Sequence, residues 1–249
     1  MKIAAAQIKP IKGNIKQNIE NHKKLIDIAI TRNVDVIIFP ELSITGYEPD
    51  LAEELSIHYE DPILNDFQTI ADRNNISIGV GMPTRIDDQL MISCIIFQPN
   101  RKRDIYSKQH LFPTEVDIFT KGEQFYQLEV LQNIISIAIC YDLSDPLHSE
   151  HAFRNNSQIY FASVLNSVQG IDNDLYKLSH IGKKYNMHVM MANFIGESGG
   201  YTCAGQTSVW NNEGKPLGQL NNTREGILIL NTENNQIEKC YNERVSIDD

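Results

Sequence analysis

A short apolar segment, residues 34–39, places the strongest constraint on how this chain folds. The segment is almost wholly apolar and ends at Pro40. A strand with apolar side chains on both faces must be covered by other layers on both faces, as in sheets packed between helices or a second sheet. Glu41 follows Pro40 directly, so we expect a carboxylate at the carboxyl end of a buried strand.

The surrounding sequence alternates between strand and helix patterns. Helical spacing of apolar residues starts at Asn14 and stops before Asn33. Further helices are predicted at residues 63–74, 146–155 and 175–186, and strands at residues 2–8, 76–82, 89–97, 104–106, 159–165 and 188–192. The strand at 104–106 leads into Lys108.

The second half of the chain is predicted to contain hairpins. Residues 125–130 and 134–139 read as two strands paired across Gln132 and Asn133, and Cys140 follows the second strand directly. Later short strands are expected near residues 203–210, 217–220 and 226–231, and a polar tail at 246–249 is expected to fray.

Alternating strands and helices with added hairpins predict an α/β layered fold. No repeat, low-complexity tract or Pro/Ser-rich linker divides the sequence, so we expect one domain over residues 1–249. In layered α/β folds ligands collect at the carboxyl ends of the strands. Glu41, Lys108 and Cys140 all come near such ends.

Charge and composition exclude several classes of partner. With 22 Lys and Arg against 32 Asp and Glu, the formal net charge of −10 repels phosphate backbones and anionic membranes, so neither nucleic acid nor a membrane is an expected partner. The longest nearly apolar stretch, residues 134–141, is too short to span a bilayer. The N-terminus lacks the apolar core of a signal peptide, which predicts a cytoplasmic protein. Four cysteines without a Cys-x-x-Cys pair predict free thiols.

Cys140 is a candidate nucleophile, although a lone thiol after a buried strand is more often an inert apolar residue. The abrupt turn expected after it would leave backbone N–H groups free to bind an oxyanion. A thiol attacks as thiolate, so Cys140 needs a base and a nearby cation, which Glu41 and Lys108 can supply. The alternative is that Glu41 and Lys108 form a structural ion pair or are simply solvated.

Three sequence motifs around these residues make the pattern more specific. They are FPELSITGY at residues 39–47, YSKQHLF at 106–112 and CYD at 140–142. In order and spacing they resemble the nitrilase superfamily of carbon-nitrogen hydrolases. The similarity also takes in residues 3–7, 119–122, 162–165, 191–193 and 205–214, and so covers nearly the whole chain.

The resemblance implies a four-layer α-β-β-α sandwich that usually pairs with a second copy, giving a homodimer or higher homo-oligomer, and needs no cofactor. It makes Glu41 the general base, Lys108 the oxyanion stabiliser and Cys140 the nucleophile, with the backbone N–H of Tyr141 completing the oxyanion hole. Many members carry a further glutamate after the lysine, which Glu115 matches here. Glu115, Tyr141 and Tyr47 are therefore the candidate substrate-binding residues; an exposed, idle Glu115 is the alternative.

The predicted function is hydrolysis of a carbon-nitrogen bond in a small amide-like substrate through a thioester on Cys140. Nitrile or N-carbamoyl hydrolysis on the same triad is one alternative, and a non-catalytic member that binds a small molecule or a protein is another. After the cysteine, many members continue through an arginine and a Phe-Pro-Glu-like segment, whereas residues 143–148 read LSDPLH. The substrate and dimer contacts of that segment are therefore left open.

Three other sites compete for the same residues. His148 and His151 share a helix face and could bind a metal, but no third ligand motif accompanies them, so no metal is expected and surface positions are preferred. A Cys140 pair with His110 or His148 would leave the Glu41 and Lys108 motifs unexplained. The glycines at 79–81 and 196–200 complete no nucleotide-binding fingerprint.

Overall fold

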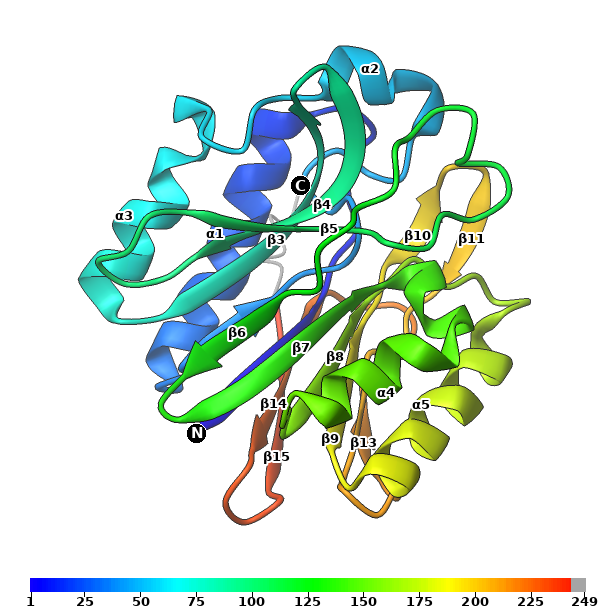
Figure 1. Cartoon of the computed structure of the whole chain (residues 1–249). Helices are drawn as coiled ribbons and strands as arrows, with labels where there is room; N and C mark the ends of the chain where they lie inside the picture. Colours follow the sequence, from blue (N-terminus) through cyan, green and yellow to red (C-terminus); the bar gives the residue numbers. More distant parts are fainter. Residues whose placement is uncertain (243–249) are drawn as a thin grey trace.

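The computed structural model describes residues 1–242, and the predicted polar tail at 246–249 lies outside the described residues. Two β-sheets pack face to face, and helices cover the outer face of each (Figure 1). The molecule is therefore the predicted four-layer α-β-β-α sandwich. In residues 1–242 no helix has both the length and the apolarity needed to span a bilayer.

The first sheet contains seven of the described strands, in the order β15-β14-β1-β2-β3-β4-β5. Strands β1, β2 and β3 are parallel, and the others pair antiparallel with their neighbours. The bounds are β1 Lys2–Gln7, β2 Val36–Ile38, β3 Ser77–Ile86, β4 Gln89–Phe97, β5 Asp104–Ser107, β14 Gly226–Asn231 and β15 Ile237–Tyr241.

The second sheet contains six described strands, in the order β13-β12-β9-β8-β7-β6, with β7, β8 and β9 parallel. A separate pair, β10 and β11, stands at one end of the molecule (Figure 1). The bounds are β6 Gln127–Val130, β7 Asn133–Ile139, β8 Ile159–Ser163, β9 His188–Ala192, β10 Ile195–Ser198, β11 Tyr201–Ala204, β12 Ser208–Trp210 and β13 Pro216–Gln219.

Helices α1 and α3 lie on the first sheet, and α4 and α5 on the second (Figure 1). Helix α1 begins where expected, because the Asn14 side chain accepts a hydrogen bond from the Gln17 N–H at 3.2 Å. Helices α3 and α5 each end at an asparagine in the left-handed conformation. The bounds are α1 Ile15–Thr31, α2 Ala52–Leu55, α3 Asn65–Asn74, α4 Pro146–Arg154 and α5 Ile171–Tyr185, with 3₁₀ turns η1 Pro49–Leu51, η2 Pro62–Leu64 and η3 Cys140–Ser144.

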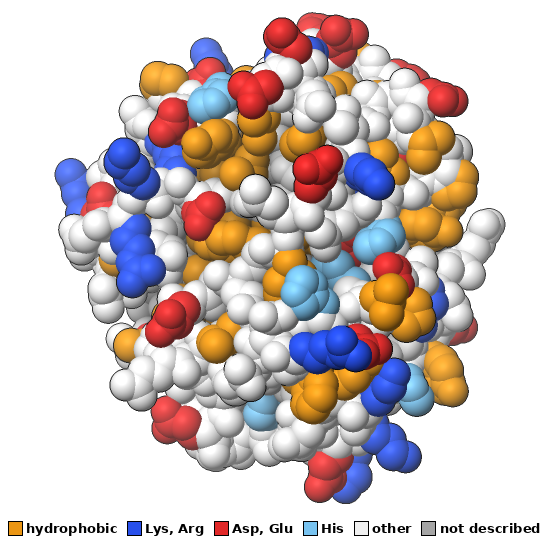
Figure 2. All heavy atoms as spheres, in the orientation of Figure 1, with side chains coloured by type: hydrophobic (Ala, Val, Ile, Leu, Met, Phe, Trp, Pro, Cys, Tyr) orange, Lys and Arg blue, Asp and Glu red, His pale blue; other side chains and the backbone are white. Residues whose placement is uncertain are grey.

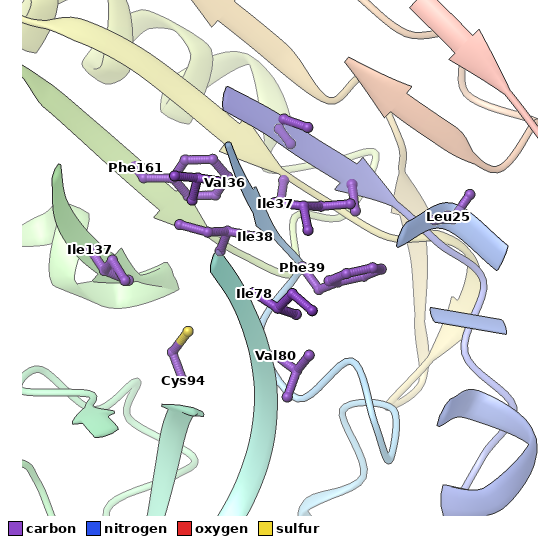
Figure 3. Close-up of a cluster of buried hydrophobic side chains, with 14 of the residues drawn as sticks. Leu25, Val36, Ile37, Ile38, Phe39, Ile78, Val80, Cys94, Ile137 and Phe161 are labelled. Carbon is purple, nitrogen blue, oxygen red and sulfur yellow. The ribbon is translucent and has the colours of Figure 1, made fainter. Parts of the chain in front are cut away.

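The apolar segment around β2 lies at the centre of the core, as its composition requires. Val36 and Ile38 point toward Phe161 of the second sheet, whereas Phe39 points toward α1 (Figure 3), where its ring lies 4.1 Å from that of His22. All of these side chains are fully buried. Burying both faces of β2 fixes the position at which the chain leaves the sheet toward Glu41.

Several element boundaries differ from the sequence predictions. The β6–β7 turn is Leu131-Gln132, both with positive φ, one residue earlier than predicted. Residues 203–210 form parts of two strands in different sheets, because the chain turns at Gly205 with φ of +63°. Strands β10 and β15 were not predicted.

Candidate active site

The carboxyl ends of β2, β5 and β7, from both sheets, meet at one edge of the molecule. Glu41 follows β2, Lys108 follows β5, and Cys140 follows β7. The two sheets are tied together there, since the Ser163 hydroxyl at the end of β8 donates a hydrogen bond to the carbonyl of Phe39. The predicted site residues are thus brought to one place by the topology.

Glu41 is buried in a tight turn that passes close to β3. Its neighbour Leu42 has a φ of +53°, and a Cβ placed on Gly81 would collide with backbone atoms of Leu42 and Pro40. Glycine at position 81 therefore allows the turn to lie against the sheet. The turn orients the Glu41 carboxylate into the interior, where only 1% of the residue is exposed.

Lys108 is a fully buried ammonium group held between two carboxylates. Its Nζ lies 2.7 Å from Oε1 of Glu41 and 2.8 Å from Oε2 of Glu115. Glu115 is itself 1% exposed, and it accepts hydrogen bonds from the Tyr47 hydroxyl at 2.7 Å and from the Phe112 N–H at 2.7 Å. Glu115 is therefore part of this buried charge network, and the expectation that its side chain could be exposed is wrong.

Cys140 occupies a sharp turn between β7 and the 3₁₀ turn η3. Its φ is +44°, a conformation that is unusual for a residue with a side chain and is often found at functional sites. Because η3 starts at Cys140, the first backbone N–H groups of the turn lack partners within it. The thiol lies 3.8 Å from the Leu165 carbonyl, and the residue is partly exposed.

The electrostatics of the site keep a proton acceptor poised near neutral pH. Burial raises the pKa of Glu41 to about 7, with the positive charge of Lys108 opposing the rise and Glu115 adding to it. Oε2 of Glu41 has no hydrogen-bond partner of ordinary geometry among the described residues. A buried, unsatisfied carboxylate oxygen with a raised pKa is suited to accept a proton.

The two other ionisable groups are perturbed in a consistent way. Burial raises the pKa of the Cys140 thiol well above its usual value, and the negative charge of Glu41 adds to the rise while Lys108 opposes it. Burial also opposes the charge of Lys108, but Glu41, Cys140 and Glu115 together raise its pKa. The resting site is therefore a protonated thiol beside a lysine that stays charged.

Asp142 links the cysteine turn to the lysine segment, a role that sequence analysis did not assign. Its carboxylate accepts hydrogen bonds from the backbone N–H groups of Ile139 at 2.8 Å and His110 at 2.8 Å, and from the Tyr106 hydroxyl at 2.7 Å. Although burial opposes its charge, the side chain of His110, the charge of His148 and the hydrogen bonds from Tyr106 and Ile139 lower the pKa of Asp142. The contacts fix the spacing between Cys140 and Lys108.

A cavity of about 290 Å³ opens beside the thiol. Glu41, Tyr47, Glu115, Cys140 and Tyr141 line it, as expected for candidate site residues, whereas Lys108 lies behind the wall. Sequence analysis missed the rest of the lining, which comes mainly from the segment after β8 and from α5: Phe112, Ser144, Leu165, Asn166, Ser167, Gly170, Asn173, Asp174, Lys177 and Tyr201. Of these, Asn166 could have been found by its position just after a predicted strand.

The histidines of the alternative sites have different surroundings. His148 is buried, so its expected surface position is wrong; it hydrogen-bonds to the Tyr106 and Tyr160 hydroxyls, while His151 stacks on Phe125. In residues 1–242, no three His, Cys, Asp or Glu side chains are grouped to hold a metal. All four cysteines fall within the described residues and are free thiols.

The model of the carbon-nitrogen hydrolase family matches residues 2–241. The chain belongs to the carbon-nitrogen hydrolase family. This confirms the superfamily indicated by the motifs around Glu41, Lys108 and Cys140, and with it the expected class of enzyme, a carbon-nitrogen hydrolase.

Known proteins similar to this carbon-nitrogen hydrolase are distant in sequence. A probable nitrilase of Schizosaccharomyces pombe is 25% identical over 235 residues, which cover 91% of this chain and 86% of that one. A Staphylococcus aureus protein described as the hydrolase in the agr operon is 24% identical over 248 residues, covering 96% and 94%. The solved amidase of Nesterenkonia sp. AN1 superposes with a TM-score of 0.84 at 22% identity, covering 93% of this chain and 92% of that one, which confirms the fold.

Proposed function

We propose that this carbon-nitrogen hydrolase cleaves a small carboxamide through a thioester on Cys140, with Glu41 as general base and Lys108 as the stabilising cation. The observation that carries the proposal is the buried contact of 2.7 Å between Lys108 Nζ and Glu41 Oε1. Glu41 lines the same cavity as Cys140. A structural ion pair alone does not account for a carboxylate oxygen left without a hydrogen-bond partner beside a cavity among the described residues.

The first half of the reaction forms the thioester. Cys140 Sγ attacks the carbonyl carbon as its proton moves to Oε2 of Glu41. The negative charge on the carbonyl oxygen is stabilised by the Tyr141 N–H and by the positive potential of Lys108 behind the cavity wall. The carbon-nitrogen bond then breaks, and the proton on Glu41 passes to the departing nitrogen, which leaves as ammonia or an amine.

The second half regenerates the enzyme. Glu41 removes a proton from water, the hydroxide attacks the thioester carbonyl, and the carbon-sulfur bond breaks to release a carboxylic acid. The sulfur recovers its proton from Glu41. In this scheme Glu115 positions Lys108 through their 2.8 Å contact, and the rings of Tyr47 and Tyr141 flank the substrate.

The names of similar proteins agree with amide chemistry. The Nesterenkonia protein is an amidase, and one of its structures shows acrylamide added at its active-site cysteine. A protein of S. pombe that is 24% identical over 159 residues is a protein N-terminal amidase. A nitrile or an N-carbamoyl amine would use the same residues here, and the experiment below distinguishes them.

Intact mass spectrometry of the protein mixed with amide, nitrile and N-carbamoyl compounds tests the proposal. We expect an acyl adduct on Cys140 with amides, together with ammonia release that Cys140→Ala abolishes. Cys240→Ala is the matched control, because it removes a thiol on β15, away from the cavity. Adducts formed only with nitriles or only with N-carbamoyl compounds would show that those compounds, and not amides, are the substrates. If no class of compound forms an adduct, the result would favour a protein that binds a ligand without turnover.

We also propose that the domain over residues 1–249 is cytoplasmic and forms a homodimer or higher homo-oligomer. Apolar side chains stay exposed on the outer helices: Leu147 and Phe153 on α4 are 66% and 51% exposed, and Tyr176 on α5 is 72% exposed. Figure 2 shows apolar side chains beside cationic ones over this region. Light scattering during size-exclusion chromatography should give twice the chain mass or more, and Phe153→Lys should lower it.

A further inference from the structure

An ion pair on α5 forms part of the cavity wall and takes no part in the proposed chemistry. Asp174 and Lys177 stand three residues apart on the helix, with Nζ 3.1 Å from Oδ1. Both side chains line the cavity that contains Cys140. They present a negative and a positive charge side by side to any molecule that occupies it.

The carboxylate of this pair is more buried than the carboxylate of a pair with the same spacing on α1. Glu20 and Lys23 on α1 have the same spacing and lie 2.8 Å apart, but the Glu20 side chain is 56% exposed. The Asp174 side chain is only 17% exposed. A carboxylate that has lost much of its contact with water binds a cation more strongly than one on the surface.

The cavity is small, and both the thiol and the ion pair lie in its wall. Its volume of about 290 Å³ is at the lower end of the range for small-molecule sites. Besides burial, Glu41 and Glu115, the charge of Asp174 also raises the pKa of the Cys140 thiol, so the carboxylate lies within electrostatic range of the sulfur. A short aliphatic linker is therefore sufficient between the reacting amide and a charged distal end.

We propose that Asp174 and Lys177 determine specificity by binding the ammonium and the carboxylate of a zwitterionic substrate, the side-chain amide of a small α-amino acid. The inference rests on the proposed amidase function. The ammonium pairs with Asp174 and the carboxylate with Lys177, while the amide lies at Cys140. A substrate carrying only negative charge is disfavoured, because its carboxylate at Lys177 would leave the charge of Asp174 without a cation.

Four amides with the same reacting end separate the two charges. L-Glutamine carries both, 4-aminobutanamide lacks the carboxylate, glutaramate lacks the ammonium, and butyramide lacks both. The measurement is kcat/KM for ammonia release from each, expressed as a ratio to butyramide. We expect wild-type protein to prefer L-glutamine by about 10-fold or more, from charge-assisted hydrogen bonds that butyramide cannot form.

Charge-neutral variants assign each contact. Asp174→Asn should lower the kcat/KM ratios for L-glutamine and 4-aminobutanamide by about 10- to 100-fold. Lys177→Met should lower the ratios for L-glutamine and glutaramate by a similar factor. The double exchange, Asp174→Lys with Lys177→Asp, keeps an ion pair on the helix but inverts it. It should also abolish the preference for L-glutamine, whereas a pair that only stabilises α5 predicts no change. Glu20→Gln and Lys23→Met, in the α1 pair outside the cavity, are the matched controls.

Two outcomes overturn the inference in distinguishable ways. If butyramide is hydrolysed through a Cys140 adduct but L-glutamine is not preferred, or if Asp174→Asn leaves the ratios unchanged, the specificity assignment fails and the amidase function stands. If none of the four amides yields ammonia or an adduct, the proposed function fails and the specificity assignment fails with it.

Discussion

The hydroxyl of Ser163 donates a 2.8 Å hydrogen bond to the backbone carbonyl of Phe39, two positions before Glu41. Ser163 ends β8 of the second sheet, and Phe39 follows β2 of the first. Both residues are fully buried. The bond therefore joins the two sheets at the point where the chain leaves the core toward the proposed catalytic base.

Replacing Ser163 by alanine should weaken both the fold and the reaction. The buried Phe39 carbonyl would lose this hydrogen bond, at a cost of about 1–3 kcal/mol in the free energy of unfolding, and kcat should fall because the Glu41 turn is less firmly held. Urea denaturation and steady-state kinetics measure the two effects. Ser179→Ala is the control: it removes a 2.7 Å hydrogen bond to the Gly214 carbonyl, and neither residue lines the cavity. It should lower stability but not kcat. Equal kinetic effects of the two variants would contradict the prediction.

The pH dependence of the reaction should report the ionisation of Glu41. Burial raises the pKa of Glu41 to about 7, and a general base must be deprotonated, so kcat/KM should rise with pH through about 7. Glu115→Gln removes a negative charge that favours the protonated form of Glu41, and the rise should therefore move to lower pH. A profile that stays in place or moves to higher pH in Glu115→Gln would show that these carboxylates are not coupled.

Stability should decline in mild acid because of His22. Burial lowers the pKa of His22 to about 3, while the ring bonds to the Asn18 carbonyl and to Ser43 in the Glu41 turn. Below pH 6.5, the pKa of histidine in the unfolded chain, His22 binds a proton in the unfolded state but not in the folded state. The His22 contribution is thus complete above about pH 6.5, and about 2 kcal/mol of it is lost by about pH 5.

Urea midpoints at about pH 7.5 and about pH 5 test this account. In His22→Gln the urea midpoint should change less with pH than in the wild type, although the variant is less stable than the wild type at about pH 7.5. His58→Gln, at an exposed site, is the control and should keep the wild-type slope. If both variants lose stability on acidification as the wild type does, another group causes the decline.

Gly81→Ala should damage the site through backbone displacement. The added methyl group collides with Pro40 and Leu42, whose atoms cannot move as a side chain can, so we expect a loss of about 3 kcal/mol in stability and a fall in kcat. Gly79→Ala in the same strand meets only the side chains of Cys94 and Ile38 and should cost less. Thermal unfolding and kinetics of the two variants provide the comparison, and a milder effect at position 81 would be inconsistent with this packing.

Sequence patterns were most informative where a single rule decided the outcome. Apolar runs predicted the ends of β1, β2, β4 and β9 to within two residues. Because Glu41, Lys108 and Cys140 each come just after a strand, the sequence also predicted that they lie near one another. The family motifs added Glu115, whose burial no local pattern predicts.

The missed features depend on long-range packing. Strands β10 and β15 carry polar side chains or glycine and pair only because a neighbouring strand is already in place. Helix α5 was predicted to begin at residue 175, so Asp174 fell outside it. Its position in the cavity wall follows from how α5 lies on the second sheet, which local sequence does not encode.

Lys108 and Glu41 extend from the first sheet, and Cys140 extends from the second. Until the two sheets dock, the lysine and the glutamate have no cysteine beside them, and a chain with only one sheet formed carries an ordinary thiol. The rate of alkylation of Cys140 can therefore report the assembly of the fold, because the reactivity of the thiol changes when the two sheets dock. In partly folded chains, which are the ones most at risk of aggregation, Cys140 would react as the ordinary thiols do, without the environment that the docked sheets give it.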